Sequence, residues 1–158
     1  SDNIIKNTPN AIIVLNENFV VQQINTAACQ LMNLQREEDI LGSPVVRILD
    51  PTPFMETAQK GKNSYDRRVY LAEYGKYVDQ TIIFDKSYHA LICIMRDVTE
   101  EAKKEEKKEA ISRITAETAD KVIEKQMRIV QEIASLLGET TAETKVALTK
   151  LKESLTNE

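Results

Sequence analysis

Few residues in this chain have the type and spacing that catalysis or metal binding requires. The 158 residues contain one histidine, His89, and two cysteines, Cys29 and Cys93, which lie far apart in the sequence. Zinc and calcium sites need ligands clustered at characteristic spacings, and the sequence shows no such cluster. It also lacks a glycine-rich phosphate loop. We therefore expect a protein that is not an enzyme and that has no catalytic or metal-binding residues.

The cysteines and the overall composition favour a cytoplasmic protein. Both cysteines stand among apolar residues, which favours buried free thiols over a disulfide. No apolar run approaches the roughly 20 residues of a membrane span, and no secretion signal is recognisable. The net charge of −4 argues against nucleic acid as a partner. Because the chain starts with Ser1 rather than Met, we expect it to come from a longer protein.

The first 97 residues predict an α+β domain of short elements. Asn25 or Thr26 can cap a helix over residues 27–34, because their side-chain oxygens accept from free backbone N–H groups. Strands alternate with turn residues elsewhere, and the predicted ranges are 11–15, 19–24, 65–72, 76–84 and 88–96, with helical turns at 44–49 and 53–60. Residues 90–95 are apolar at both parities. Since an antiparallel strand with one wet face should alternate, we expect a partner subunit or flanking helices to cover its second face.

A long charged helix is predicted to follow, over residues 98–137. Its acidic and basic residues are balanced, which is typical of a solvated helix. Apolar residues recur at spacings of three and four, so that one face carries a stripe wider than a strict coiled-coil seam. A single domain cannot bury such a stripe, and we therefore expect a homodimer. The predicted dimer-interface residues are Ile111, Ile114, Val122, Ile129, Ile133 and Leu136.

A last helix is predicted within residues 138–158, so that the chain ends in a helical hairpin. Gly138 can end the long helix, and Thr140 to Glu143 match a capping box. Residues 132–138 also match the first helix of DNA-binding helix–turn–helix motifs, so a transcriptional regulator is the alternative function. The lysines that follow are balanced by glutamates, whereas a phosphate-binding surface should be more basic. This balance argues against DNA binding.

The order of these elements resembles that of PAS domains, and several motifs support the resemblance. The run from Asn7 to Leu15 resembles the usual PAS opening, and Ile24-Asn25 resembles the start of the first PAS helix. The turn at residues 40–45 is similar to that of the family, and residues 96–101 are similar to its junction with a signalling helix. The resemblance implies a sensor domain over residues 1–97, with Asp97, Val98 and Thr99 as the signal junction. Thr99 can cap the first turn of the helix that follows, and Asp97 can bond to a backbone N–H or to a nearby base such as Arg96 or Arg68. If the domain has a ligand pocket, its candidate lining residues are Cys29, Met32, Tyr70 and Cys93.

Residues 122–145 are similar to the C-terminal end of a particular group of sensors. These are iron–sulfur proteins of anaerobic bacteria that resemble iron-only hydrogenase. The resemblance implies an iron–sulfur cluster in a region that precedes this chain, no cofactor in the chain itself, and a downstream phosphatase or other regulatory protein as partner. We expect a sensory and dimerisation module that relays a redox or small-molecule signal through a helical bundle. A histidine kinase is excluded, because no histidine follows Thr99.

Overall fold

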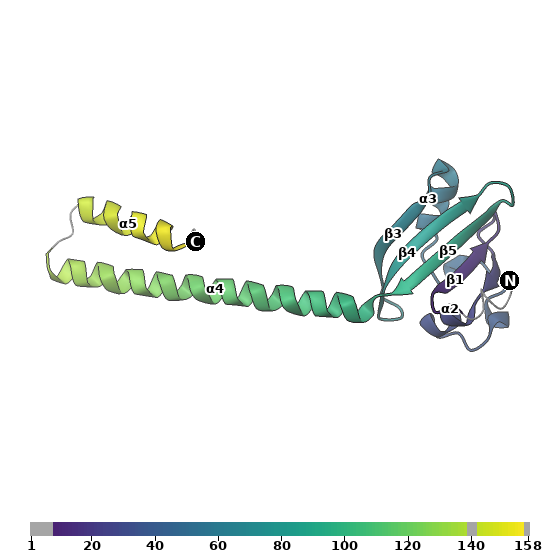
Figure 1. Cartoon of the computed structure of the whole chain (residues 1–158), viewed down its shortest axis with the longest axis horizontal. Helices are drawn as coiled ribbons and strands as arrows, with labels where there is room; N and C mark the ends of the chain where they lie inside the picture. Colours follow the sequence, from purple (N-terminus) through teal and green to yellow (C-terminus); the bar gives the residue numbers. More distant parts are fainter. Residues whose placement is uncertain (1–7, 139–141, 157–158) are drawn as a thin grey trace. The chain divides into compact units, whose positions relative to one another are not determined.

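Alternating apolar residues build an antiparallel sheet from the first part of the chain. The computed structural model describes residues 8–138 and 142–156. The sheet has five strands in the order β2-β1-β5-β4-β3 (Figure 1). The strands are β1 (Ala11–Leu15), β2 (Val21–Ile24), β3 (Ser64–Leu71), β4 (Lys76–Asp85) and β5 (Ala90–Asp97). The predicted hairpin and three-strand meander are thus confirmed.

Short helical elements follow β2 and cover one face of the sheet. They are α2 (Thr26–Leu31), 3-10 turns at Glu37–Asp39 and Val45–Arg47, and α3 (Thr52–Lys60). Side chains from alternate positions of the strands point to this face and form one core with the helices. Phe54 of α3 and Ile13 of β1 are fully buried there. Burial of this apolar surface is the main source of stability of the domain.

Asn25 fastens α2 to the sheet. Its Oδ1 accepts from the N–H of Ala28, which confirms Asn25 as the helix cap, and also from the N–H of Ile12 on β1. Its amide donates to the carbonyl of Asn10. The helix ends earlier than the predicted residue 34, because Asn33 adopts a left-handed conformation with φ 57°.

Strand β5 carries apolar residues on both faces, but the chain buries only one of them fully. Leu91, Cys93 and Met95 lie in the core, whereas Ile92 and Ile94 face the other side and are half-buried. That a partner subunit or flanking helices cover the second face of β5 therefore stays a prediction.

The chain divides into two compact units between Ala102 and Lys103. α4 (Thr99–Leu136) begins in the first unit, and residues from Lys103 onward belong to the second. α5 (Ala142–Thr156) completes the second unit and runs back alongside α4 (Figure 1). Lys152 Nζ lies 2.5 Å from Glu124 Oε1. The predicted hairpin is confirmed, and Gly138, with φ 74°, follows the end of α4. The predicted capping box includes residues 140 and 141, which lie outside the described residues.

This hairpin differs from a DNA-binding helix–turn–helix motif. In such a motif the second helix crosses the first at a steep angle, whereas α5 returns along α4. In the described part of the chain, no helix combines the length and hydrophobicity needed to cross a membrane.

Candidate signalling junction

The last strand of the sheet changes into α4 over very few residues. β5 ends at Asp97 and α4 begins at Thr99. Between them, the Val98 side chain is buried, and its backbone N–H donates to the carbonyl of Tyr77 on β4 over 2.8 Å. Ala102, one turn into α4, is also buried. The start of the helix is therefore packed into the first unit.

Asp97 caps the start of α4. Its Oδ1 accepts from the Thr99 N–H at 3.0 Å and from the Thr99 hydroxyl at 2.5 Å. The first N–H groups of a helix have no partner within the helix, so a carboxylate at this place stabilises them. Burial by itself would raise the pKa of Asp97, but the two hydrogen bonds from Thr99 and the charge of Lys76 together lower it.

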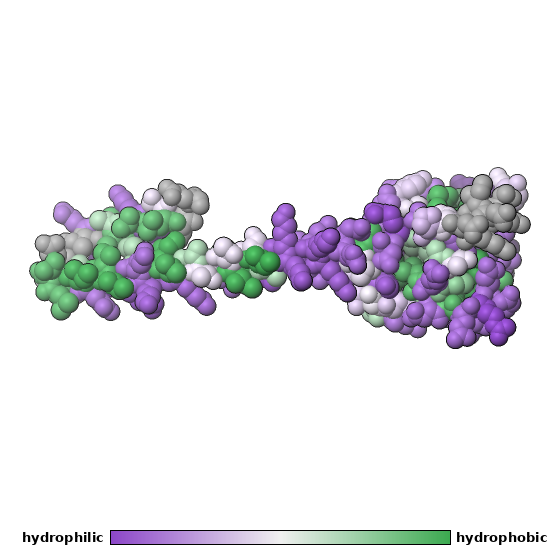
Figure 2. Space-filling model, turned by 60° about the horizontal axis from the view of Figure 1, so that its bottom comes forward, coloured by the Kyte–Doolittle hydropathy of each residue, from purple (hydrophilic) through white to green (hydrophobic). Residues whose placement is uncertain are grey.

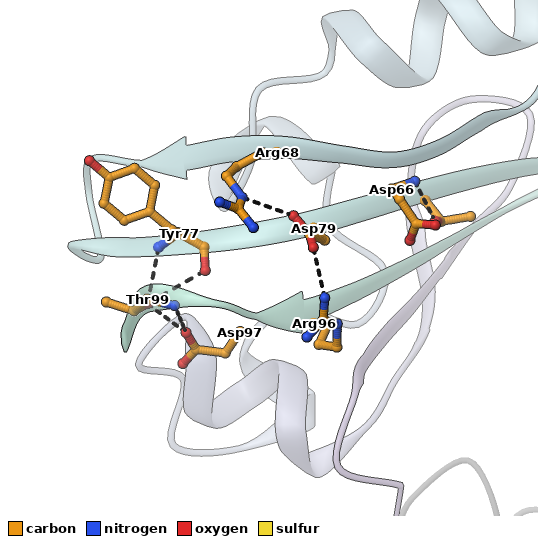
Figure 3. Close-up of polar contacts among 8 residues, drawn as sticks. Asp66, Arg68, Tyr77, Asp79, Arg96, Asp97 and Thr99 are labelled. Atoms are coloured by element: carbon orange, nitrogen blue, oxygen red, sulfur yellow. Dashed lines mark hydrogen bonds and ion pairs between the residues drawn. The ribbon is translucent and has the colours of Figure 1, made fainter. Parts of the chain in front are cut away.

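The Thr99 hydroxyl joins the helix to the neighbouring strand. The hydroxyl oxygen accepts a hydrogen bond from the N–H of Tyr77 at 3.1 Å, and the hydroxyl donates one to Oδ1 of Asp97 (Figure 3). The sequence suggested that this hydroxyl caps the first turn of its own helix, and that interpretation is wrong. The pairing of Val78 with Asp97 brings Tyr77 to the hydroxyl, and Asp97 takes the capping role.

Arg68 and Arg96, which lie near the junction, form ion pairs with Asp79 and not with Asp97. Arg68 Nε lies 3.2 Å from Asp79 Oδ1, and Arg96 Nη2 lies 2.9 Å from Asp79 Oδ2 (Figure 3). The sequence offers Asp97 either a backbone N–H or a base such as Arg96 or Arg68 as its partner. The Thr99 N–H confirms the first alternative, whereas the base beside Asp97 is Lys76 rather than an arginine, with its Nζ 3.9 Å from Oδ2. The signal that could have located Asp79 is its position opposite Arg68 and Arg96 on neighbouring strands.

The residues predicted for the dimer interface are all exposed on α4. Their exposed fractions run from 46% at Ile129 to 87% at Leu136. Met127 is instead nearly buried, and it projects from another side of the helix, since residues 127 and 129 differ by about 200° around the axis. Further exposed apolar residues lie beside the predicted ones or on α5, and they are Val130, Leu137, Val146, Leu151 and Leu155. Figure 2 shows hydrophobic side chains gathered over this end of α4 and over α5.

Three of the four candidate pocket residues share the core. Cys29, Met32 and Cys93 are buried in the same hydrophobic cluster. Tyr70 lies elsewhere: it is 52% exposed on β3 and its ring lies 4.6 Å from that of Tyr77, centroid to centroid. Burial raises the pKa of Cys93 to about 12. Burial, followed by the nearby charge of Glu37, also raises the pKa of Cys29.

Sequence reasoning did not anticipate a cleft that lies beside the junction. It has a volume of about 230 Å³. Its lining residues come from α2, from the start of β1, from the start of β4 and from the end of β5, just before α4 begins. Asp97 and Lys76 both line it. Within residues 8–138 and 142–156, no group of three or more His, Cys, Asp or Glu side chains could hold a metal ion.

Comparisons with known proteins agree with this architecture. Residues 2–65 match the family model described as PAS fold. The PAS domain of a protein from Colwellia psychrerythraea is similar in structure, with a TM-score of 0.50 and 14% identity over 63% of this chain and 94% of that one. No curated protein matches the chain.

Two further solved PAS domains have lower TM-scores. That of nitrogen regulation protein NR(II) from Vibrio parahaemolyticus has a TM-score of 0.45 and 19% identity, over 60% of this chain and 94% of that one. The PAS domain of the quorum-sensing receptor RpfR from Cronobacter turicensis, in complex with BDSF, has a TM-score of 0.46 and 17% identity, over 58% of this chain and 96% of that one. The match of residues 2–65 and the five-stranded antiparallel sheet together show that the first unit of this chain has the PAS fold.

Proposed function

We propose that this chain relays a signal from its PAS domain, through Asp97, Val98 and Thr99, to a dimeric helical bundle that acts on a partner protein. The observation that carries the proposal is the position of the Thr99 hydroxyl. It bonds to Tyr77 on β4 and to Asp97 at the end of β5, and it belongs to the first turn of α4. One side chain therefore connects two strands with the signalling helix.

This connection couples movements of the sheet to the helix. If β4 shifts against β5, the hydroxyl cannot keep both of its hydrogen bonds, because Tyr77 and Asp97 belong to different strands. The buried Val98 and its hydrogen bond to Tyr77 resist the same movement. A change of about 1.4 kcal/mol in this network shifts a two-state equilibrium of the helices about tenfold.

The second part of the proposal is a homodimer formed by the apolar stripe of α4, which we define as Ile111, Ile114, Val122, Ile129, Ile133 and Leu136. The side of α4 that holds the nearly buried Met127 and the ion-paired Glu124 faces α5. Ile129 and Ile133 project away from that side and are exposed. A second copy of the chain offers a matching apolar surface, as closed symmetric dimers require.

The input that we propose is a redox or small-molecule signal. Thiolate is the reactive form of cysteine, and the raised pKa values of Cys93 and Cys29 keep both thiols protonated near neutral pH. Redox chemistry would therefore belong to another region of the protein, in line with the resemblance of residues 122–145 to iron–sulfur sensors. The partner in this proposal is a phosphatase or another regulatory protein, and the proposed role is not enzymatic.

Light scattering at micromolar concentration tests the dimer. We expect about twice the chain mass of 17.9 kDa. Ile129→Glu and Ile133→Glu should dissociate the dimer, because each places a charge in the apolar contact of both copies. Arg113→Glu is the control, since it changes the charge of an exposed residue that lies about 100° or more around the helix axis from every member of the stripe. A monomeric wild-type chain would refute the dimer.

Cross-linking tests the relay. Single cysteines placed along residues 111–130 report how the two copies of α4 face each other. Thr99→Val should leave the dimer mass unchanged but alter the ratio of cross-linked products several-fold, because it removes both hydroxyl bonds. Thr99→Ser keeps the hydroxyl and should preserve the wild-type pattern. Identical patterns in all three proteins would show that the junction is only a linker.

A further inference from the structure

The cleft beside the junction combines an apolar floor with a pair of opposite charges. Ala11, Leu31 and Met95 line it and are each buried, so its floor is the edge of the hydrophobic core. Lys76 and Asp97 also line it, with side chains 43% and 47% exposed. Small-molecule sites have this composition, since apolar walls supply most of the contact area and a few polar groups set the orientation.

The two charges are close together but do not form a direct hydrogen bond. Lys76 Nζ and Asp97 Oδ2 are 3.9 Å apart, beyond the roughly 3.2 Å limit of N–H···O bonds. Oδ1 of the same carboxylate is engaged by Thr99. Lys76 and Oδ2 can therefore each form a shorter, charge-assisted bond with a ligand while the cap of α4 remains in place.

We propose that this cleft binds a small aliphatic amino acid as its zwitterion. The ligand carboxylate pairs with Lys76, the ammonium group pairs with Oδ2 of Asp97, and the aliphatic side chain packs on Ala11, Leu31 and Met95. An anion alone would be repelled by Asp97 and a cation alone by Lys76, whereas a zwitterion satisfies both. The volume of about 230 Å³ lies below the roughly 300 to 1,000 Å³ of sites for drug-sized ligands, which suits a smaller molecule.

Binding at this place would reach the junction directly. The ammonium group would approach the same carboxylate that accepts from the Thr99 hydroxyl and N–H. It would compete with Thr99 for the negative charge of Asp97 and weaken the link between α4 and the sheet. This consequence rests on the proposed relay function, but binding itself does not.

The test is a titration of the full chain with L-leucine, followed by amide NMR shifts. We expect saturable shifts at Ala27 and Met95, which line the cleft, and at Thr99. The carboxylate analogue 4-methylpentanoate and the amine analogue 3-methylbutylamine should bind at least about tenfold more weakly, since each lacks one charge-assisted bond of about 1.5 kcal/mol. Equal binding by either analogue would overturn the assignment of a zwitterion.

Two variants locate the site. Lys76→Met should weaken leucine binding by about tenfold or more, for the same reason. Lys86→Met is the matched control, because Lys86 is an exposed lysine just beyond the other end of β4 and does not line the cleft. No saturable shift up to about 10 mM leucine, or an equal effect of the two variants, would overturn the site. Binding with an unchanged cross-linking pattern in α4 would confirm the site and refute the relay.

Discussion

Replacing Thr99 by valine should destabilise the first unit, which has the PAS fold, and the structure sets the size of the effect. Valine keeps the branched shape of threonine but removes the hydroxyl that bonds to Tyr77 and Asp97. The hydrogen bond from a backbone N–H contributes about 1 kcal/mol. The bond to the Asp97 carboxylate belongs at the low end of the charged range, about 1.5 kcal/mol, because that side chain is 47% exposed. We therefore expect a loss of about 2 to 3 kcal/mol.

Thr99→Ser is the matched control for this substitution. Serine keeps the hydroxyl and loses only the γ-methyl group, which should cost about 0.8 kcal/mol or less. The Thr99 N–H continues to donate to Asp97 in both variants, so that the comparison isolates the hydroxyl. A simple N-terminal cap would predict only about 1 kcal/mol for the loss of the hydroxyl.

Urea unfolding followed by tyrosine fluorescence measures this difference. All five tyrosines lie within residues 65–88, and the chain contains no tryptophan, so the emission reports the first unit alone. The three proteins should share one m-value, since the same surface is exposed on unfolding. A difference below about 0.5 kcal/mol between the valine and serine variants would refute the role of the hydroxyl, because surface substitutions commonly fall within that range.

The pH dependence provides an independent check on the same bond. The pKa of Asp97 is lowered in the folded protein from its ordinary value of 3.8. A lowered carboxyl pKa stabilises the folded state above the unfolded pKa, and this contribution is lost as the pH falls through the folded pKa. The stability difference between wild type and Thr99→Val should therefore be constant above about pH 5 and decrease below 3.8. A difference that grew on acidification would contradict the assignment.

Two further predictions concern buried polar groups. Asn25→Asp should lower the free energy of unfolding in urea at pH 7 by about 3 kcal/mol or more, because it buries a charge and replaces the amide that donates to Asn10 by an acceptor. Thr26→Asp, at an exposed neighbouring residue, is the control. Equal stability of the two variants would contradict the structure. In a Cys29→Ser background, Cys93 should react with a disulfide reagent at pH 8 only as fast as the domain unfolds, since its side chain is fully buried and burial also raises its pKa to about 12. Rapid labelling of the native protein would contradict its burial.

Local patterns in the sequence were sufficient for much of the fold. The apolar alternation located the strands, because side chains of a strand point to opposite faces at every second residue. Asn25 was recognisable as a cap because a helix start needs a side-chain acceptor within a few residues. The exposed stripe around Ile129 followed from helical spacing alone. Each of these features depends on residues that are close together in the chain.

Tertiary structure decided what the junction residues contact. Thr99 and Tyr77 are 22 residues apart, and only the register of β4 against β5 brings the hydroxyl to that N–H. The same register places Arg96 in an ion pair with Asp79 and places Lys76 beside Asp97. Tyr70 lies outside the core because the face on which a residue falls depends on strand pairing, and a bulge precedes it in β3.

The cleft also depends on tertiary structure. Its lining residues come from β1, α2, β4 and β5, which are spread between Pro9 and Asp97 in the chain. No local motif in any of these elements indicates a cleft. A local pattern records which face of an element is apolar, but not which elements meet at the end of a sheet. That meeting results from the packing of α2 and β1 around the core, and it determines that the charges of Lys76 and Asp97 share a cleft with apolar side chains.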